Sequence, residues 1–151
     1  MRKRFFTVTV ITLATAVGVL LSSPTVGARP AVSDSPASAS NAKADIQEGN
    51  LGCGFGTGKP VIGFVNFHRL GNRVSINFHL KDGSPNTNYV VSLWGEGCSF
   101  AAFLGSTTTN QNGVANFTGS TTVPPALTRF FATGWGGPLF FNDTTTVTLE
   151  P

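Results

Sequence analysis

Two acidic residues, Glu96 and Asp143, form the pair in this sequence that could carry hydrolytic chemistry. A glycoside hydrolase needs two carboxyl groups facing each other across a cleft, one as the acid and one as the base or nucleophile. The spacing of Glu96 and Asp143 in the sequence allows them to converge in the fold. Any small set of surface carboxylates contains a pair of which the same could be said. The sequence has neither a Gly-x-Ser-x-Gly elbow nor a His-Glu-x-x-His zinc motif. A small extracellular hydrolase is therefore the alternative hypothesis, and a non-catalytic protein is the preferred one.

Aromatic residues offer a second kind of chemistry, because they outnumber what one face of a strand can bury. Phe130-Phe131 and Phe140-Phe141 are adjacent pairs, and neighbours on a β-strand point to opposite faces. These rings and the two tryptophans, which lie beside glycines, either cover the ends of the fold or form an exposed platform. The platform would stack on a cell-wall glycan or dock an extracellular protein. Its candidate binding residues are Trp94, Trp135, Phe131 and Phe140.

Cys53 and Cys98 are the only cysteines, so only one pairing is possible. An exported chain meets an oxidising environment, in which such a pair forms a disulfide. The separation of the two cysteines is far longer than the C-x-x-C spacing of a redox-active pair. We therefore predict a structural disulfide between Cys53 and Cys98.

Nothing in the sequence predicts a metal or a cofactor. The Gly-rich run 52–59 lacks two residues of a phosphate-binding loop, because Cys53 and Pro60 stand where glycine and Ser or Thr are needed. His68 and His79 are the only histidines. A two-residue turn at Gly71-Asn72 would put both on one polar face, but four residues apart along the strand, which is too far for one metal ion.

Residues 1–28 have the three parts of a secretory signal peptide. Arg2-Lys3-Arg4 is the basic start, residues 7–21 are an apolar run, and Val26 and Ala28 precede a cleavage site at Arg29. The apolar run is short for a membrane span, and no other long apolar run follows it. We expect a secreted protein whose mature chain has no membrane span. The Ala/Ser-rich leader is typical of bacteria.

Loss of this leader changes the charge of the protein. The full chain has 10 basic and 7 acidic residues and a net charge of +3, but the mature chain keeps seven of each. The remaining basic residues are scattered along the sequence. A neutral chain without a basic patch gives no reason to expect binding to nucleic acid.

The mature chain divides into two parts by composition. Residues 29–50 are rich in Ala, Ser and Pro and contain no aromatic residue, so we predict a disordered linker there. Residues 51–151 are rich in aromatic, glycine and β-branched residues and have the length of one domain.

Residues 73–80 give the clearest strand, because Val74, Ile76, Phe78 and Leu80 fall on one face. Further strands are expected at residues 61–68, 89–94, 99–104, 114–118, 127–133 and 144–149. Turn-forming residues separate them, and no helical periodicity is present. Seven short strands predict an all-β fold, a two-sheet antiparallel immunoglobulin-like sandwich, with a small closed barrel as the alternative.

Several of these segments resemble a pattern found in small secreted bacterial β-sandwich domains. They are Pro-Asn-Thr-Asn-Tyr-Val-Val-Ser-Leu-Trp at 85–94, Leu-Gly-Ser-Thr-Thr-Thr at 104–109 and Gly-Val-Ala-Asn-Phe at 113–117, together with Cys98. The resemblance implies an immunoglobulin-like sandwich and names no function. The enediyne-binding apoproteins related to neocarzinostatin are similar in size, export and sandwich type. They carry two disulfides where this chain has one possible pair, so their ligand is not expected here.

Overall fold

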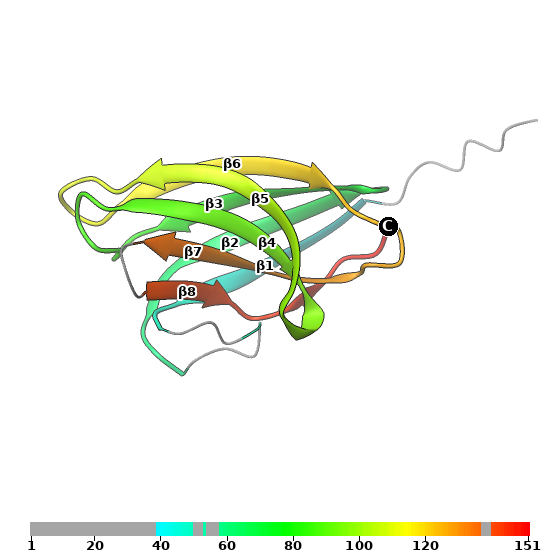
Figure 1. Ribbon diagram of the computed structural model, residues 1–151, viewed down its shortest axis with the longest axis horizontal. Helices are drawn as coiled ribbons and strands as arrows, with labels where there is room; N and C mark the ends of the chain where they lie inside the picture. The colour runs from blue at the N-terminus through cyan, green and yellow to red at the C-terminus, as the bar shows by residue number, and fades with distance from the viewer. Residues whose placement is uncertain (1–38, 50–52, 54–57, 137–139) are drawn as a thin grey trace, which may run out of the picture. The chain divides into compact units, whose positions relative to one another are not determined.

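Nine strands and one short 3-10 turn make up the part of the chain that the computed structural model describes, residues 39–49, 53, 58–136 and 140–151 (Figure 1). The elements are β1 Ala39–Gln47, β2 Val61–Leu70, β3 Arg73–Leu80, β4 Asn88–Gly95, η1 Glu96–Cys98, β5 Ser99–Thr108, β6 Ala115–Thr122, β7 Arg129–Gly136, β8 Phe140–Thr144 and β9 Val147–Thr148. All strand pairs are antiparallel. The predicted all-β antiparallel fold is confirmed. The predicted signal peptide lies outside the described residues.

The strands form a single sheet in the order β5-β4-β7-β8-β1-β2-β3-β6, with β9 added beside β7. Its two end strands, β5 and β6, lie side by side (Figure 1). The Thr107 hydroxyl of β5 donates a hydrogen bond to the Asn116 carbonyl of β6 across 3.1 Å. The sheet therefore curls nearly into a barrel. Its pairing is not divided into two sheets, so the sandwich expectation is met only in its all-β antiparallel part.

The core lies on the inner face of this sheet. In β3 the alternation is as predicted, because Val74, Ile76, Phe78 and Leu80 are all buried. The Gly71-Asn72 turn pairs Leu70 with Arg73, which confirms the predicted hairpin register. The same period of two continues in the neighbouring strands, where the other buried apolar side chains include Val65, Phe67, Tyr89, Val91, Leu93 and Phe130.

The first strand, β1, corrects the predicted linker. Residues 29–50 were expected to be disordered, but Ala39–Gln47 pair with β2 along their whole length. Their inward positions hold Ala42, Ala44 and Ile46, which pack in or against the core. Small alanines at alternate positions are a weak hydrophobic signal, which is why composition alone suggested disorder. Residues 29–38 lie outside the described part of the chain.

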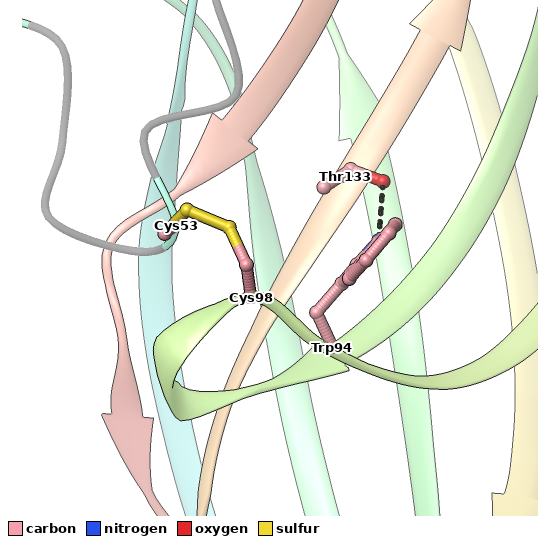
Figure 2. Close-up of a disulfide and its surroundings, with 4 residues drawn as sticks. All are labelled: Cys53, Trp94, Cys98 and Thr133. Carbon is pink, nitrogen blue, oxygen red and sulfur yellow. Dashed lines mark hydrogen bonds between the residues drawn. A yellow bond between two sulfur atoms is a disulfide. The ribbon is translucent and has the colours of Figure 1, made fainter.

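The predicted disulfide between Cys53 and Cys98 is present, with 4.9 Å between the two Cα atoms. Cys53 belongs to the connection from β1 to β2, and Cys98 ends η1, between β4 and β5. Because successive neighbours in the sheet are antiparallel, these two connections start from opposite ends of the sheet. The disulfide therefore joins the β1–β2 connection to η1, and Figure 2 draws it together with Trp94 and Thr133.

Arg69 of β2 is a charged residue that is fully buried. Its guanidinium lies 5.6 Å from the centre of the Phe130 ring. Its N–H groups donate to five backbone carbonyls, those of Gly71, Pro124, Pro125, Leu127 and Leu149. Arginine can satisfy this many acceptors because its five donors are held in one plane. Arg69 thereby closes the end of the sheet at which β2 ends.

Candidate functional site

The outer face of β4, β5 and β7 gathers most of the aromatic side chains that the core does not take. The strand register sets three rows across it, namely Ser106–Val90–Trp135, Phe103–Ser92–Thr133 and Phe100–Trp94–Phe131. Two of these rings, Phe103 and Phe100, are 61% and 58% exposed, and Trp135 is 44% exposed. Large apolar rings that stay this exposed on one face mark a candidate binding surface.

Two bulges in β5 bring its phenylalanines to this face. The register against β4 shifts between Val91 and Ser92 and again between Leu93 and Trp94. A bulge adds one residue to a strand and so reverses which face the following side chains occupy. After the two shifts, Phe103 lies opposite Ser92 and Phe100 opposite Trp94, both on the outer face.

A shallow groove of about 320 Å³ runs across the first of these rows. The aromatic residues that line it are Trp135 and Phe103, and Val90 of β4 lies between their strands. The polar residues are Asn88, which offers an amide, and Ser106, which offers a hydroxyl. None of the five lining residues carries a charge.

Phe131 lies beneath this face, and the half-buried Trp94 packs against it. The Trp94 ring lies 6.2 Å from the Phe131 ring, nearly parallel to it, and 5.1 Å from the Phe100 ring, edge to face. Its indole N–H donates to the hydroxyl of Thr133 (Figure 2). Phe131 is 0% exposed and so has no surface left for a ligand.

Trp135 stands on strand β7, which continues to Gly136 and so runs three residues beyond the end of the strand expected at 127–133. The flanking glycines make room for the core. A Cβ atom at Gly134 would lie 2.5 Å from the Phe78 ring, and one at Gly136 would lie 2.6 Å from the Tyr89 ring. The remaining predicted binding residue, Phe140, begins β8 opposite Gly136, and its side chain is outside the described part of the structure.

The two carboxylates of the hydrolase hypothesis lie in different surroundings. Glu96 is half exposed in η1 and forms an ion pair with Arg129. Asp143 of β8 is 0% exposed. General acid–base catalysis needs both groups within reach of substrate. A buried carboxylate and a surface ion pair do not provide that.

The two histidines share the outer face of β2 and β3, as the hairpin register predicted. Nδ1 of His68 lies 2.7 Å from Oδ1 of Asn41, and Nδ1 of His79 lies 2.6 Å from Oδ1 of Asn116. The His79 ring also stacks on Phe64. In the described part of the chain, no three His, Cys, Asp or Glu side chains come together as metal ligands.

Phe103 and Phe100 are the residues of this face that sequence reasoning missed. A strand was expected at 99–104, but a strict period of two would put its two phenylalanines on opposite faces. Only the bulges bring them to the same face, and no local sequence signal marks both bulges. Gly105 is the one hint, since it adopts a φ of 147° at the first of them.

The described residues contain no helix that is long and apolar enough to span a membrane.

Comparison with known proteins identifies no relative of this chain. No protein-family model, curated protein or solved structure matches this chain.

Proposed function

We propose that this protein is a secreted, non-catalytic binding domain whose ligand is a neutral glycan held in the groove between Trp135 and Phe103. The observation that carries the proposal is the pairing of two exposed aromatic rings with an amide and a hydroxyl in one uncharged groove. Small-ligand sites commonly combine apolar walls with a few polar groups that fix orientation.

Sugar rings suit this combination of side chains. A pyranose presents a face of C–H groups, which packs on an aromatic ring, and an edge of hydroxyls, which needs hydrogen-bonding partners. Trp135 and Phe103 supply the flat apolar surfaces. Asn88 and Ser106 supply groups that both donate and accept hydrogen bonds.

The absence of charge in the groove argues for a neutral ligand. An anionic polysaccharide is bound most directly through Arg and Lys, which form charge-assisted hydrogen bonds. None of the described residues lining the groove is of this kind. We therefore favour uncharged wall or capsule sugars over acidic polymers.

A protein partner is the second candidate, and Phe100 is the observation that favours it. This ring is 58% exposed and lies two rows from Trp135, so the aromatic surface extends beyond the groove. Protein interfaces are enriched in such rings. The extracellular hydrolase hypothesis has no comparable support, because Asp143 is buried and Glu96 is ion-paired.

The proposed location is the cell envelope or the extracellular space of a bacterium. It depends on the signal peptide predicted from residues 1–28, and the Cys53–Cys98 disulfide is compatible with it. For the fold, we propose a nearly closed antiparallel barrel in place of the immunoglobulin-like sandwich, because the strand pairing follows one unbroken path.

A polysaccharide panel tests the ligand class. Affinity electrophoresis of the purified protein in gels that contain neutral or acidic polysaccharides should retard it in one or more neutral gels. Retardation only by acidic polymers would contradict the neutral-ligand proposal. If no polysaccharide retards the protein, and an envelope protein binds it in a way that Trp135→Ala abolishes, the protein-docking candidate is favoured.

A further inference from the structure

Asn142 of β8 is a buried polar side chain whose hydrogen bonding is incomplete. It is 2% exposed, and its Oδ1 accepts no hydrogen bond from any of the described residues. Buried polar atoms in folded proteins nearly always have a partner, so an exception indicates an ion, a water or a ligand. This asparagine is far from both disulfide cysteines in the sequence and is not part of the aromatic groove.

Asn142 lines a cavity of about 150 Å³, and two acidic residues, Glu48 and Asp82, line it as well. Glu48 follows β1 directly, and since Gln47 pairs with Asp143, the register carries Glu48 opposite Asn142. Asp82 follows β3, and its N–H donates to the Ile62 carbonyl. The cavity therefore lies where β1 and β3 end, beside the middle of β8.

The loop that carries Asp82 is held in place by its own hydrogen bonds. The N–H of Ser84 donates to the Tyr89 hydroxyl at 2.8 Å, and the N–H of Gly83 donates to the Gly113 carbonyl at 3.0 Å. The Thr109 hydroxyl donates to the Ser84 carbonyl at 2.6 Å. Ser84 and Tyr89 both line the cavity. Its rim is thus preorganised, which reduces the entropy lost when a ligand binds.

From this arrangement we infer that the cavity is a calcium site formed by Glu48, Asp82 and Asn142. All three side chains offer oxygen, which is the donor that calcium prefers, and two of them carry negative charge. None of the described residues that line the cavity is Lys, Arg or His. The Lys81 ammonium, next to Asp82 in sequence, lies over the Phe64 ring instead, 5.3 Å from its centre.

The size of the cavity favours calcium over magnesium. Calcium accepts six to eight oxygen ligands in flexible geometry, whereas magnesium demands a small octahedral shell. A cavity of about 150 Å³ has room for water ligands beside the three side chains. The three protein ligands are two carboxylates and one amide. Because calcium affinity depends on the number of charged ligands, this set predicts weak binding.

Thermal unfolding of the purified, EDTA-treated protein tests the site without reference to glycan binding. Addition of calcium should raise the Tm, with a dissociation constant of roughly 10⁻⁴–10⁻³ M, as in extracellular calcium modules. Magnesium at the same concentration should raise it less. Terbium, a luminescent substitute for calcium, should emit when Tyr89 in the cavity wall is excited, and calcium should displace it.

Three variants make the test specific. Asp82→Asn and Glu48→Gln should each weaken calcium binding by about tenfold or more, because each removes a charged ligand. Asp45→Asn, which removes an exposed carboxylate on β1 that does not line the cavity, should leave the affinity unchanged. No calcium-dependent rise in Tm and no terbium emission would overturn the proposal. The proposal would also be overturned if Asp45→Asn lost as much calcium affinity as the two cavity variants, or if magnesium bound as tightly as calcium.

Discussion

The indole N–H of Trp94 donates to the Thr133 hydroxyl across 3.1 Å, and this bond joins β4 to β7 on the outer face of the sheet. Trp135 follows Thr133 by two residues and therefore lies on the same face of the same strand. One tryptophan is thus committed to the structure, while the other is exposed on the groove. The two tryptophans should respond differently to substitution.

Replacing Trp94 by phenylalanine should lower the free energy of unfolding by about 1 kcal/mol, since it removes this hydrogen bond but keeps a ring against Phe131. Ligand binding should be unaffected. Urea unfolding measured by circular dichroism gives the stability, and titration with the bound polysaccharide gives the affinity. Loss of binding in this variant, with stability unchanged, would mean that Trp94 contacts the ligand.

Arg69→Met should be among the most damaging single substitutions in the domain. It leaves five buried or partly buried carbonyls without their donor, including those of Leu127 and Leu149. Breaking a buried charged network of this kind costs about 3–5 kcal/mol. Arg73→Met is the matched control, because Arg73 is exposed and its guanidinium donates to the Ser120 hydroxyl at the surface. Similar unfolding curves for the two variants would contradict a structural role for Arg69.

The disulfide should contribute about 4 kcal/mol to stability, the chain-entropy value for cysteines 45 residues apart. The Cys53→Ser/Cys98→Ser double variant should therefore unfold at a lower urea concentration than the oxidised protein. Reduction of the native protein with dithiothreitol should reproduce that shift. Titration of the unfolded, unreduced protein that finds two free thiols would contradict the pairing.

Two glycines with similar backbone angles should differ in their tolerance of alanine. Gly71 has a φ of 55° and open space where a Cβ would stand, so Gly71→Ala should cost about 1 kcal/mol. Gly113 has a φ of 73°, and a Cβ there would lie 2.0 Å from the Gly83 carbonyl oxygen. Gly113→Ala should cost roughly 2–4 kcal/mol, because the loop at the cavity rim has to move. Equal losses in thermal unfolding would contradict this packing.

Local patterns in the sequence predict the parts of the fold that depend on short-range physics. The alternation of residues 73–80 and the Gly71-Asn72 turn give the β2–β3 hairpin with its register, and the two cysteines give the disulfide. The first strand escapes prediction because its inward residues are mostly alanine. The curling of the sheet depends on contacts between β5 and β6, which no local pattern encodes.

The candidate site is predictable only in part for the same reason. Trp135 is identified by sequence, since an aromatic surplus must leave the core somewhere. Phe131 is misjudged because Trp94 stacks beside it on the outer face. Phe103 becomes a site residue through bulges in β5, and Asn142 becomes notable only when its missing partner is seen. Both depend on tertiary structure.

Calorimetric titration of a neutral polysaccharide into four proteins tests the central claim most directly. The four are the native protein, Trp135→Ala, Phe103→Ala and Leu70→Ala, the last an equally exposed apolar residue on β2, outside the groove. We predict that each groove variant loses affinity by about tenfold or more, which is about 1.4 kcal/mol, while Leu70→Ala binds as the native protein does. Unchanged affinity in both groove variants, or no heat with any neutral polysaccharide, would contradict the account.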